Sequence, residues 1–167
     1  QRNPVVLAKE IATLDLLSEG RLLFGIGAGY LHQEFAALGV DFDSRGPKTD
    51  DAIDAMRNLW SEDHPSFHGQ FIKFDGVNAY PRPTSPMGPP IIVGGTSRAA
   101  LRRTITKGQG WYGFALDVTQ TKKVLDDLTR MRDNFPRPEA LGADIEISIT
   151  PPKPLTKMMM EDSAAIG

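Results

Sequence analysis

The sequence predicts an α/β fold built around a parallel sheet, and three observations support this prediction. Short apolar segments alternate four times with segments of helical periodicity, which is the order of successive βα units. The apolar segments are nearly uninterrupted, as in strands that are buried on both faces. Two of them end in glycine-rich turns, 27–29 and 94–95, so a tight turn follows each of these strands directly.

The first predicted elements are a helix over Val5–Leu17 and a strand over 22–26. Apolar residues recur in the helix with a period of about 3.6 residues. Asn3-Pro4 is a typical helix start, and Gly20 is a candidate C-terminal cap. The strand is apolar along almost its whole length.

A second predicted helix, Tyr30–Leu38, follows the first glycine-rich turn, and a third is predicted over Lys48–Trp60. Residues 67–74 alternate around a glycine and indicate a hairpin. A connector rich in proline occupies 80–90. The whole stretch 39–90 is too long for a simple βα connection, so we interpret it as an insertion.

The second half of the chain continues the alternation of strands and helices. Its strands are predicted at 91–94, 110–113 and 145–149. Its helices are predicted over Ser97–Lys107, Asp117–Asn134 and Thr156–Ala165. Asp117 and Gln120 have the spacing of a capping box. We expect Asp50, Asp51, Asp126 and Asp127 to be solvated charges on helix surfaces.

The junction Gly94-Gly95-Thr96-Ser97, where a strand meets a helix, carries the clearest functional signal. A helix N-terminus presents unpaired N–H groups and the positive end of the helix dipole, so it can hold a phosphate. Two glycines let an anion approach the backbone without a Cβ in the way. The junction therefore predicts a phosphate-bearing ligand at the carboxyl end of a parallel strand.

The other glycine-rich turn, Gly27-Ala28-Gly29, ends a second strand, and two neighbouring strand ends would share one phosphate. Alternatively, each glycine only permits a tight turn. A dinucleotide fingerprint would need a third glycine where the chain has Tyr30. Tyr30 either lines a pocket at this strand end or packs on a neighbouring helix. We expect Trp111 in the core rather than as a platform for a cofactor.

The composition narrows the function classes. With 19 Lys and Arg against 21 Asp and Glu, the charge argues against a nucleic-acid binder. The chain has no cysteine, which excludes disulfides and thiolate metal ligands. Of His32, His64 and His68, the last two are four residues apart, but Pro65 and Gly69 indicate a loop or hairpin there rather than a helix, so we expect no metal site. No apolar run approaches the ~20 residues of a membrane span, and we expect a soluble, cytoplasmic protein.

A long ordered series of residues extends well beyond any single motif. Its first part comprises Asn3-Pro4, Ala8-Lys9, Ala12-Thr13-Leu14-Asp15, Ser18, Gly20-Arg21, Gly25-Ile26-Gly27-Ala28-Gly29-Tyr30, Glu34-Phe35 and Leu38-Gly39-Val40. Its later part comprises Arg45-Gly46, 50–60, Phe67, Gly69, Pro81, Pro83, 90–102, Gly108 and Gly110-Trp111. This series, which covers 1–111 most closely, resembles the luciferase-like monooxygenase superfamily.

The resemblance implies a partial TIM (β/α)8 barrel, about strands 4 to 7, with the insertion 39–90 after strand 4. It implies binding of FMN or of the deazaflavin coenzyme F420. The residues that match the family's cofactor-binding positions are Gly94, Gly95, Thr96 and Ser97 at one strand end and Gly27, Gly29 and Tyr30 at the other. The residues Arg45-Gly46 and Thr49-Asp50 look more like the F420-dependent branch, so F420 is favoured.

The resemblance also implies that residues 1–167 form a single partial barrel domain. A TIM barrel needs about 250 residues, so we expect three strands before Gln1 and one after Gly167. Half a barrel leaves open sheet edges, and we expect these residues alone to be poorly folded and inactive. The catalytic residues stay unassigned because the first barrel strands, which often line the pocket, lie elsewhere. Some F420-dependent sugar dehydrogenases carry a catalytic glutamate where this chain has Tyr30.

On this basis we expect an oxidoreductase that uses F420, or else reduced FMN, for hydride transfer or oxygen insertion. Its substrate would be a small organic molecule, and the full-length protein would be a homodimer. Two other classes stay open, namely a non-redox TIM-barrel enzyme acting on a phosphate ester and an inactive fragment that serves only as a binding module. The first would need a lysine or paired acids at the strand ends, and the four predicted strand ends offer none.

Overall fold

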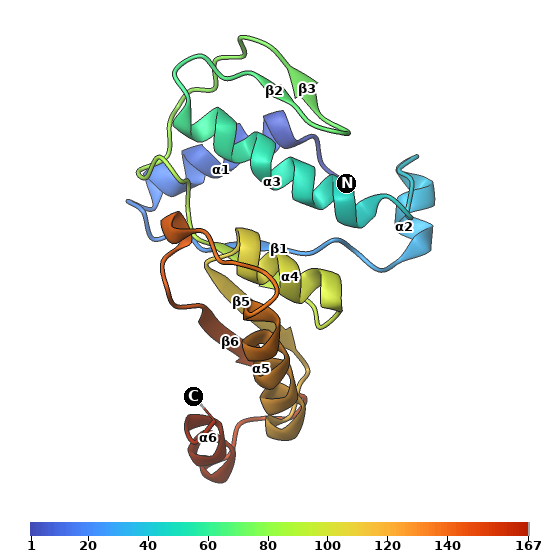
Figure 1. Cartoon of the computed structure of the whole chain (residues 1–167), viewed down its shortest axis with the longest axis vertical. Helices are drawn as coiled ribbons and strands as arrows, with labels where there is room; N and C mark the ends of the chain where they lie inside the picture. The colour runs from blue at the N-terminus through green and yellow to red at the C-terminus, as the bar shows by residue number, and fades with distance from the viewer. Residues whose placement is uncertain (167) are drawn as a thin grey trace. The chain divides into compact units, whose positions relative to one another are not determined.

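The computed structural model describes residues 1–166, and Gly167, the last residue of the predicted domain, lies outside the described residues. Figure 1 traces the helices and strands in chain order. The chain divides into two compact units. The helical unit comprises 1–24 and 28–90, and the sheet unit comprises 25–27 and the chain from Ile91 onward.

The helical unit is built on the packing of α1 (Pro4–Leu17) against α3 (Arg45–Ser61). Asn3 caps α1 as predicted, because its side-chain oxygen accepts hydrogen bonds from the first-turn amides. The Trp60 indole N–H donates to the Ala8 carbonyl at 3.0 Å. The buried core between the helices comprises Ala8, Ile11, Ala12, Met56, Leu59, Trp60 and Ala79.

A buried carboxylate fastens the end of α1 to the proline-rich connector. Asp15 is 1% exposed and accepts from both the backbone N–H and the hydroxyl of Thr84, at 2.8 and 2.6 Å. Ser18 is the C-cap of α1, and Gly20 follows with φ +76°. A Cβ on Gly20 would lie 3.0 Å from Thr84 Oγ1, so glycine here allows the connector to approach closely.

The other elements of the helical unit differ from the prediction only at their ends. Helix α2 (His32–Ala37) begins two residues later than predicted, because Leu31 has an extended backbone and precedes the helix. Helix α3 begins earlier, at Arg45. Strands β2 (Phe67–His68) and β3 (Lys73–Phe74) form the predicted hairpin in antiparallel register.

The Asp51 carboxylate of α3 holds the turn of this hairpin, so the prediction that it is only a solvated helix charge was wrong. It accepts hydrogen bonds from the backbone N–H groups of Gln70, Phe71 and Ile72, at 3.3, 2.7 and 2.9 Å. A Cβ on Gly69 would lie 2.0 Å from Asp51 Oδ1. Glycine at position 69 is therefore what lets the carboxylate reach the turn.

Four strands form the predicted sheet in the order β1-β4-β5-β6. They are β1 (Phe24–Ile26), β4 (Ile91–Gly94), β5 (Gly110–Phe114) and β6 (Glu146–Thr150). β4, β5 and β6 are parallel, with Val93, Trp111 and Ile147 in register. β1 is shorter than predicted because its hydrogen bonding begins at Phe24, whose N–H donates to the Pro90 carbonyl at 2.8 Å.

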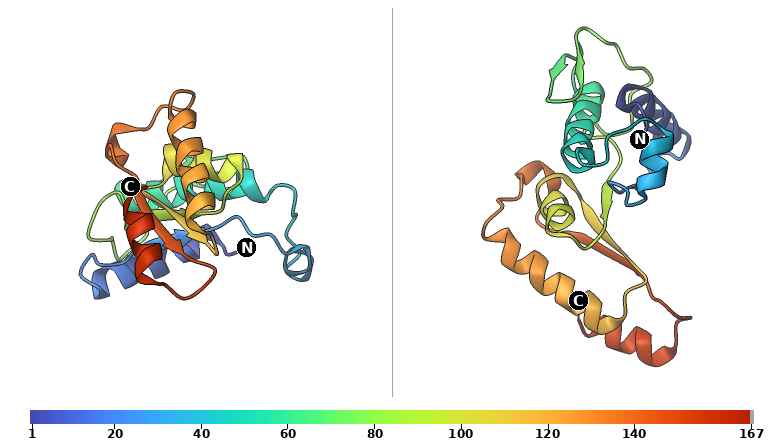
Figure 2. Two further views of the ribbon diagram at one scale, coloured as in Figure 1. Left: turned by 90° about the horizontal axis from the view of Figure 1, so that it is seen from below. Right: turned by 90° about the vertical axis from the view of Figure 1, so that its right-hand side faces the viewer.

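Helices α4 (Arg98–Lys107), α5 (Val118–Arg132) and α6 (Lys157–Ala164) complete the sheet unit. Helix α5 packs against α4 and also contacts α6 (Figure 2). The capping box at Asp117 and Gln120 is confirmed, with both hydrogen bonds present. The short 3-10 helix Glu139–Leu141 was not predicted. The core between α4, α5 and the sheet comprises Leu101, Ile105, Trp111, Val124 and Leu128.

One arginine links the end of α4 to the segment before β6. The Arg137 guanidinium donates to the carbonyls of Thr104, Ile105 and Gly108 at the end of α4. It also donates to the backbone carbonyls of Leu141, Gly142 and Asp144. Carbonyls left over at a helix C-terminus are thereby satisfied.

As for membranes, no helix within residues 1–166 has the length and apolar character needed to cross one.

Candidate functional site

The turn between β4 and α4 is an open helix N-terminus at the end of a strand. Strand β4 ends at Gly94, and Ser97 is the N-cap of α4. The Ser97 hydroxyl accepts from the Ala100 N–H at 3.2 Å, and its carbonyl accepts from the Leu101 N–H at 2.9 Å. Residues 95–99 are exposed, so the turn is accessible to a ligand.

The two glycines of this turn differ in how strongly the backbone requires them. Gly95 has φ +107°, a conformation that residues with a side chain rarely adopt. A Cβ on Gly94 would lie 3.4 Å from the Ile26 carbonyl oxygen, which is an ordinary contact distance. The local geometry therefore requires glycine at 95 but not at 94, and both glycines keep the turn free of side chains.

Trp111 of β5 fixes the carbonyl of this turn. Its indole N–H donates to the Gly95 carbonyl oxygen at 2.8 Å, and its side chain is fully buried. The predicted core position of Trp111 is therefore confirmed. The hydrogen bond to Gly95 was not predicted, because nothing in the spacing of the two residues indicates it.

The charges around the turn suit an anion. The first turn of α4 contains no acidic residue and begins with Arg98. Unpaired N–H groups and the positive end of the helix dipole lie at this terminus. The Thr96 hydroxyl and the backbone N–H groups of the turn are donors that a phosphate oxygen would accept from. The residues present thus fit a phosphate group.

Gly27 lies at the same edge of the sheet as this turn. It directly follows β1, and β1 is the neighbour of β4 in the strand order. A Cβ on Gly27 would have no neighbour within 4 Å. No packing within residues 1–166 therefore requires glycine at this position, and a role for Gly27 in binding a ligand stays a prediction.

Gly29 and Tyr30 belong to the helical unit, where Gly29 has a structural reason of its own. Gly29 has φ +85°, and a Cβ there would lie 2.7 Å from the Phe35 ring. Phe35 is 2% exposed. Tyr30 is 80% exposed, so its ring is not packed against a helix. Of the two interpretations of Tyr30, packing on a helix is contradicted by this exposure, and lining a pocket at the strand end stays a prediction.

A pair of hydroxyl groups on two neighbouring strands was missed by the sequence reasoning. The Tyr112 hydroxyl lies 2.7 Å from the Thr150 hydroxyl, within hydrogen-bonding distance. Tyr112 is in β5 and Thr150 ends β6. The period of two along a strand would have indicated that Tyr112 faces away from the buried Trp111. Its partner on another strand could not be read from the sequence.

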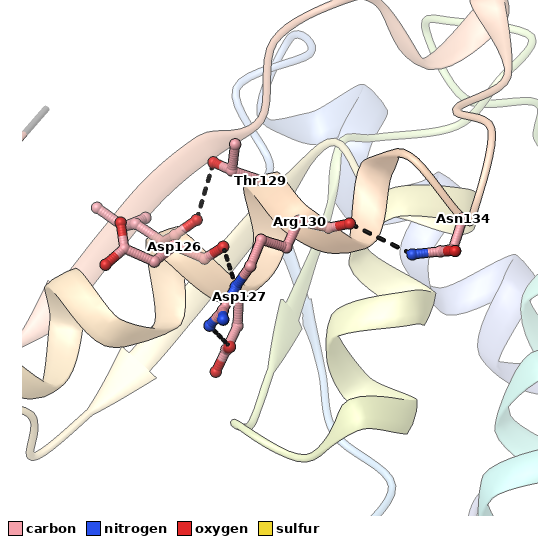
Figure 3. Close-up of polar contacts among 6 residues, drawn as sticks. Asp126, Asp127, Thr129, Arg130 and Asn134 are labelled. Atoms are coloured by element: carbon pink, nitrogen blue, oxygen red, sulfur yellow. Dashed lines mark hydrogen bonds and ion pairs between the residues drawn. The ribbon is translucent and has the colours of Figure 1, made fainter.

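The surface of α5 has a depression lined by Asp126, Thr129 and Arg130. Within the helix, the Thr129 hydroxyl donates to the Leu125 carbonyl and the Arg130 guanidinium donates to the Asp126 carbonyl (Figure 3). Asp127 pairs with Arg130, in line with its predicted role as a helix surface charge. Across residues 1–166, no three acidic or histidine side chains cluster as metal ligands would.

Comparison with known families gives a match over most of the chain. The family model described as luciferase-like monooxygenase matches residues 1–152. An uncharacterized protein of Mycobacterium tuberculosis (strain ATCC 25618 / H37Rv) is 31% identical over 148 residues, which are 87% of this chain and 52% of that protein. An FMNH(2)-dependent dimethylsulfone monooxygenase of Pseudomonas putida is 34% identical over 113 residues, 66% of this chain and 31% of the relative.

Solved structures have the same fold. Monooxygenase RslO1 from Streptomyces bottropensis has a TM-score of 0.73 at 26% identity, covering 89% of this chain and 45% of its own. An F420-dependent secondary alcohol dehydrogenase in complex with an F420-acetone adduct has a TM-score of 0.74 at 22% identity, with the same coverage. The chain spans about half the length of its first relatives, at 52% and 45%. The predicted partial luciferase-type barrel is thereby confirmed.

Proposed function

Because this chain belongs to the luciferase-like monooxygenase family, we propose that the whole protein is an oxidoreductase that binds coenzyme F420 or reduced FMN. Its substrate would be a small organic molecule. The names of two similar proteins support both cofactors, since one is FMNH(2)-dependent and the other is F420-dependent. Both cofactors carry a phosphate, which is the group that the β4–α4 turn fits.

The observation that carries the proposal is the geometry of this turn. Gly94 and Gly95 leave the backbone open, and Ser97 begins a helix whose first turn has no acidic residue. In this proposal the Thr96 hydroxyl and the turn amides hold the cofactor phosphate. Gly27, at the end of the neighbouring strand, leaves room for the cofactor to lie along the sheet edge. Gly29 and Tyr30 are proposed to border the same cofactor.

F420 is the cofactor we favour, on the resemblance of the sequence around Arg45 and Thr49 to the F420-dependent branch. In the structure these residues build the start of α3. The Arg45 guanidinium lies 3.6 Å from the centre of the Phe42 ring, and the Thr49 hydroxyl donates to the Arg45 carbonyl. Arg45 therefore holds the loop before α3 in place. The preference for F420 rests on the sequence resemblance alone.

The redox chemistry would be supplied by the bound cofactor. That chemistry would be hydride transfer with F420, or insertion of one oxygen atom of O2 into the substrate with reduced FMN. The residues described here would bind and orient the cofactor through its phosphate.

The proposal is tested by titrating the whole protein with F420 and with FMN and measuring each dissociation constant. Gly95→Ala places a Cβ in the turn, and we expect it to weaken binding of the preferred cofactor about tenfold. Gly142→Ala is the matched control, because Gly142 also has a positive φ, +75°. Gly142 lies before the start of β6, whereas Gly95 follows the end of β4. If each cofactor has the same dissociation constant in the wild type and in both variants, its phosphate binds elsewhere. If the wild type binds neither cofactor, the proposed function is disproved.

A further inference from the structure

We propose that Trp111 is a positioning residue that sets the β4–α4 turn in the conformation that binds the cofactor phosphate. The inference rests on the proposed function, since it names the residue that prepares its phosphate site. Trp111 would not touch the cofactor. It would act through one hydrogen bond to the Gly95 carbonyl.

The Trp111 ring is held rigidly enough to act in this way. It is fully buried in the core that α4 and α5 form with the sheet. Its strand position is paired with Val93 of β4, one residue before the turn begins. On the strand itself, a Cβ at Gly113 would lie 2.6 Å from the ring atom Cη2, so the ring lies directly over this glycine. The indole N–H therefore has a fixed place beneath the turn.

The hydrogen bond is difficult to give up. An indole has one N–H group, which only donates. A buried donor without a partner loses the hydrogen bonds that it made to water in the unfolded chain. Because the Gly95 carbonyl is the acceptor of Trp111, at 2.8 Å, the most favourable state of the core keeps that carbonyl turned inward.

Fixing this carbonyl also fixes the next amide. The peptide bond between Gly95 and Thr96 is trans, so its C=O and N–H groups point in opposite directions. With the carbonyl directed at the buried indole, the Thr96 N–H is directed away from it. Thr96 is exposed, and its N–H has no hydrogen-bond partner among residues 1–166. It is therefore available to an anion.

The constraint matters because Gly95 is glycine. A glycine populates positive and negative φ about equally, so it does not define the turn by itself. Trp111 supplies the restriction that the residue at position 95 lacks. A turn that is already in its binding conformation avoids the free-energy cost of being ordered when the ligand binds.

Trp60 provides a matched control within the same chain. It is also buried, at 2% exposed, and its indole N–H also donates to a backbone carbonyl, that of Ala8 at 3.0 Å. It belongs to the helical unit, in the core between α1 and α3. Trp60→Phe and Trp111→Phe thus remove the same chemical group from two buried sites, only one of which is linked to the turn.

The test uses the whole protein and two measurements. The first is the amide 1H–15N chemical shift and hydrogen-exchange rate of Thr96 without ligand. The second is the dissociation constant of the cofactor that the wild type binds. We expect Trp111→Phe to change the Thr96 amide signal and to weaken cofactor binding about three- to tenfold. Trp60→Phe should leave both unchanged, even where it lowers the melting temperature by a similar amount.

The outcomes separate this inference from the proposed function. A wild-type protein that binds neither F420 nor FMN would disprove the function, whereas the Thr96 amide would still report whether Trp111 sets the turn. An unchanged Thr96 signal and affinity in Trp111→Phe would overturn the inference although the cofactor binds. If Trp111→Phe does not fold, replacing Trp111 with β-(3-benzothienyl)alanine keeps the ring volume and removes only the N–H. The same two readouts then decide.

Discussion

The two glycine-rich turns look alike in the sequence but differ in what holds them. In the turn after β4, Gly95 has a positive φ and its carbonyl is bonded to the buried Trp111 indole. In the turn after β1, Gly29 also has a positive φ, but it is required because the Phe35 ring lies 2.7 Å from where a Cβ would be. Gly27 of the same turn faces open space.

This difference teaches that a glycine pattern alone does not identify a ligand site. Gly29 has a sufficient reason in the packing of Phe35. Gly27 has no such reason within the part of the chain that the structure describes, and it lies at the sheet edge where Gly94 ends β4. Gly29, Gly95 and Gly27 should therefore respond to substitution in three different ways.

The largest effect on stability is expected for Gly29→Ala. The new Cβ meets the buried Phe35 ring in a backbone conformation that alanine disfavours, and together these effects should cost about 3 kcal/mol. Chemical denaturation of the whole protein measures this loss. In a Phe35→Ala background the same substitution should cost only about 1–2 kcal/mol, because the ring is gone. Equal costs in both backgrounds would show that the ring is not what requires glycine.

A smaller loss of stability is expected for Gly95→Ala. Its Cβ would lie at an ordinary contact distance, 3.4 Å, from the Ala100 Cβ, so only the positive φ opposes it. We expect a cost of about 1–2 kcal/mol in the same denaturation experiment, accompanied by the loss of cofactor affinity described above. Lower stability with full affinity would mean that the turn is structural only.

Gly27→Ala should change stability by less than about 0.5 kcal/mol, because nothing lies within contact distance and φ is not in the left-handed region. Cofactor affinity is then the sensitive measurement. If the cofactor passes this strand end, the dissociation constant rises although the melting temperature does not. An unchanged dissociation constant would remove Gly27 from the proposed site.

The smallest effect on stability is expected at Asp41, whose carboxylate holds the turn before α3. Hydrogen bonds from the Ser44 side chain and from the Ser44 and Asp43 N–H groups lower the pKa of Asp41. Its stabilisation is complete above the pKa of an unfolded aspartate, about 3.9, and is lost as the pH falls through the lower folded-state pKa. Asp41→Asn should remove this part of the acid dependence of the melting temperature. An identical dependence in wild type and variant would contradict it.

Most of the fold could be predicted, because its signals are local. The periodicity of α1, α4 and α5 and the capping box at Asp117 are each contained in a few neighbouring residues. The predicted starts of β1 and α2 were wrong because hydrogen bonding of β1 begins only at Phe24 and because Leu31 has an extended backbone. Both effects depend on the folded environment rather than on the residues next to them.

The site could be predicted only in part, for a related reason. The helix start at Ser97 is a local signal, and it was found. The Trp111–Gly95 bond joins residues 16 positions apart, and the Tyr112–Thr150 pair joins residues 38 positions apart. Such partners are set by the register of parallel strands, and the sequence alone does not give this register.

The way in which Asp51 holds the hairpin bears on how this surface can be changed by evolution or by design. Its carboxylate accepts from three backbone amides and contacts no side chain of Gln70, Phe71 or Ile72 through these bonds. Every residue except proline has such an amide. The hydrogen bonds that hold the tip of the hairpin therefore tolerate any side chain other than proline at 70–72, as long as Asp51 and Gly69 are kept.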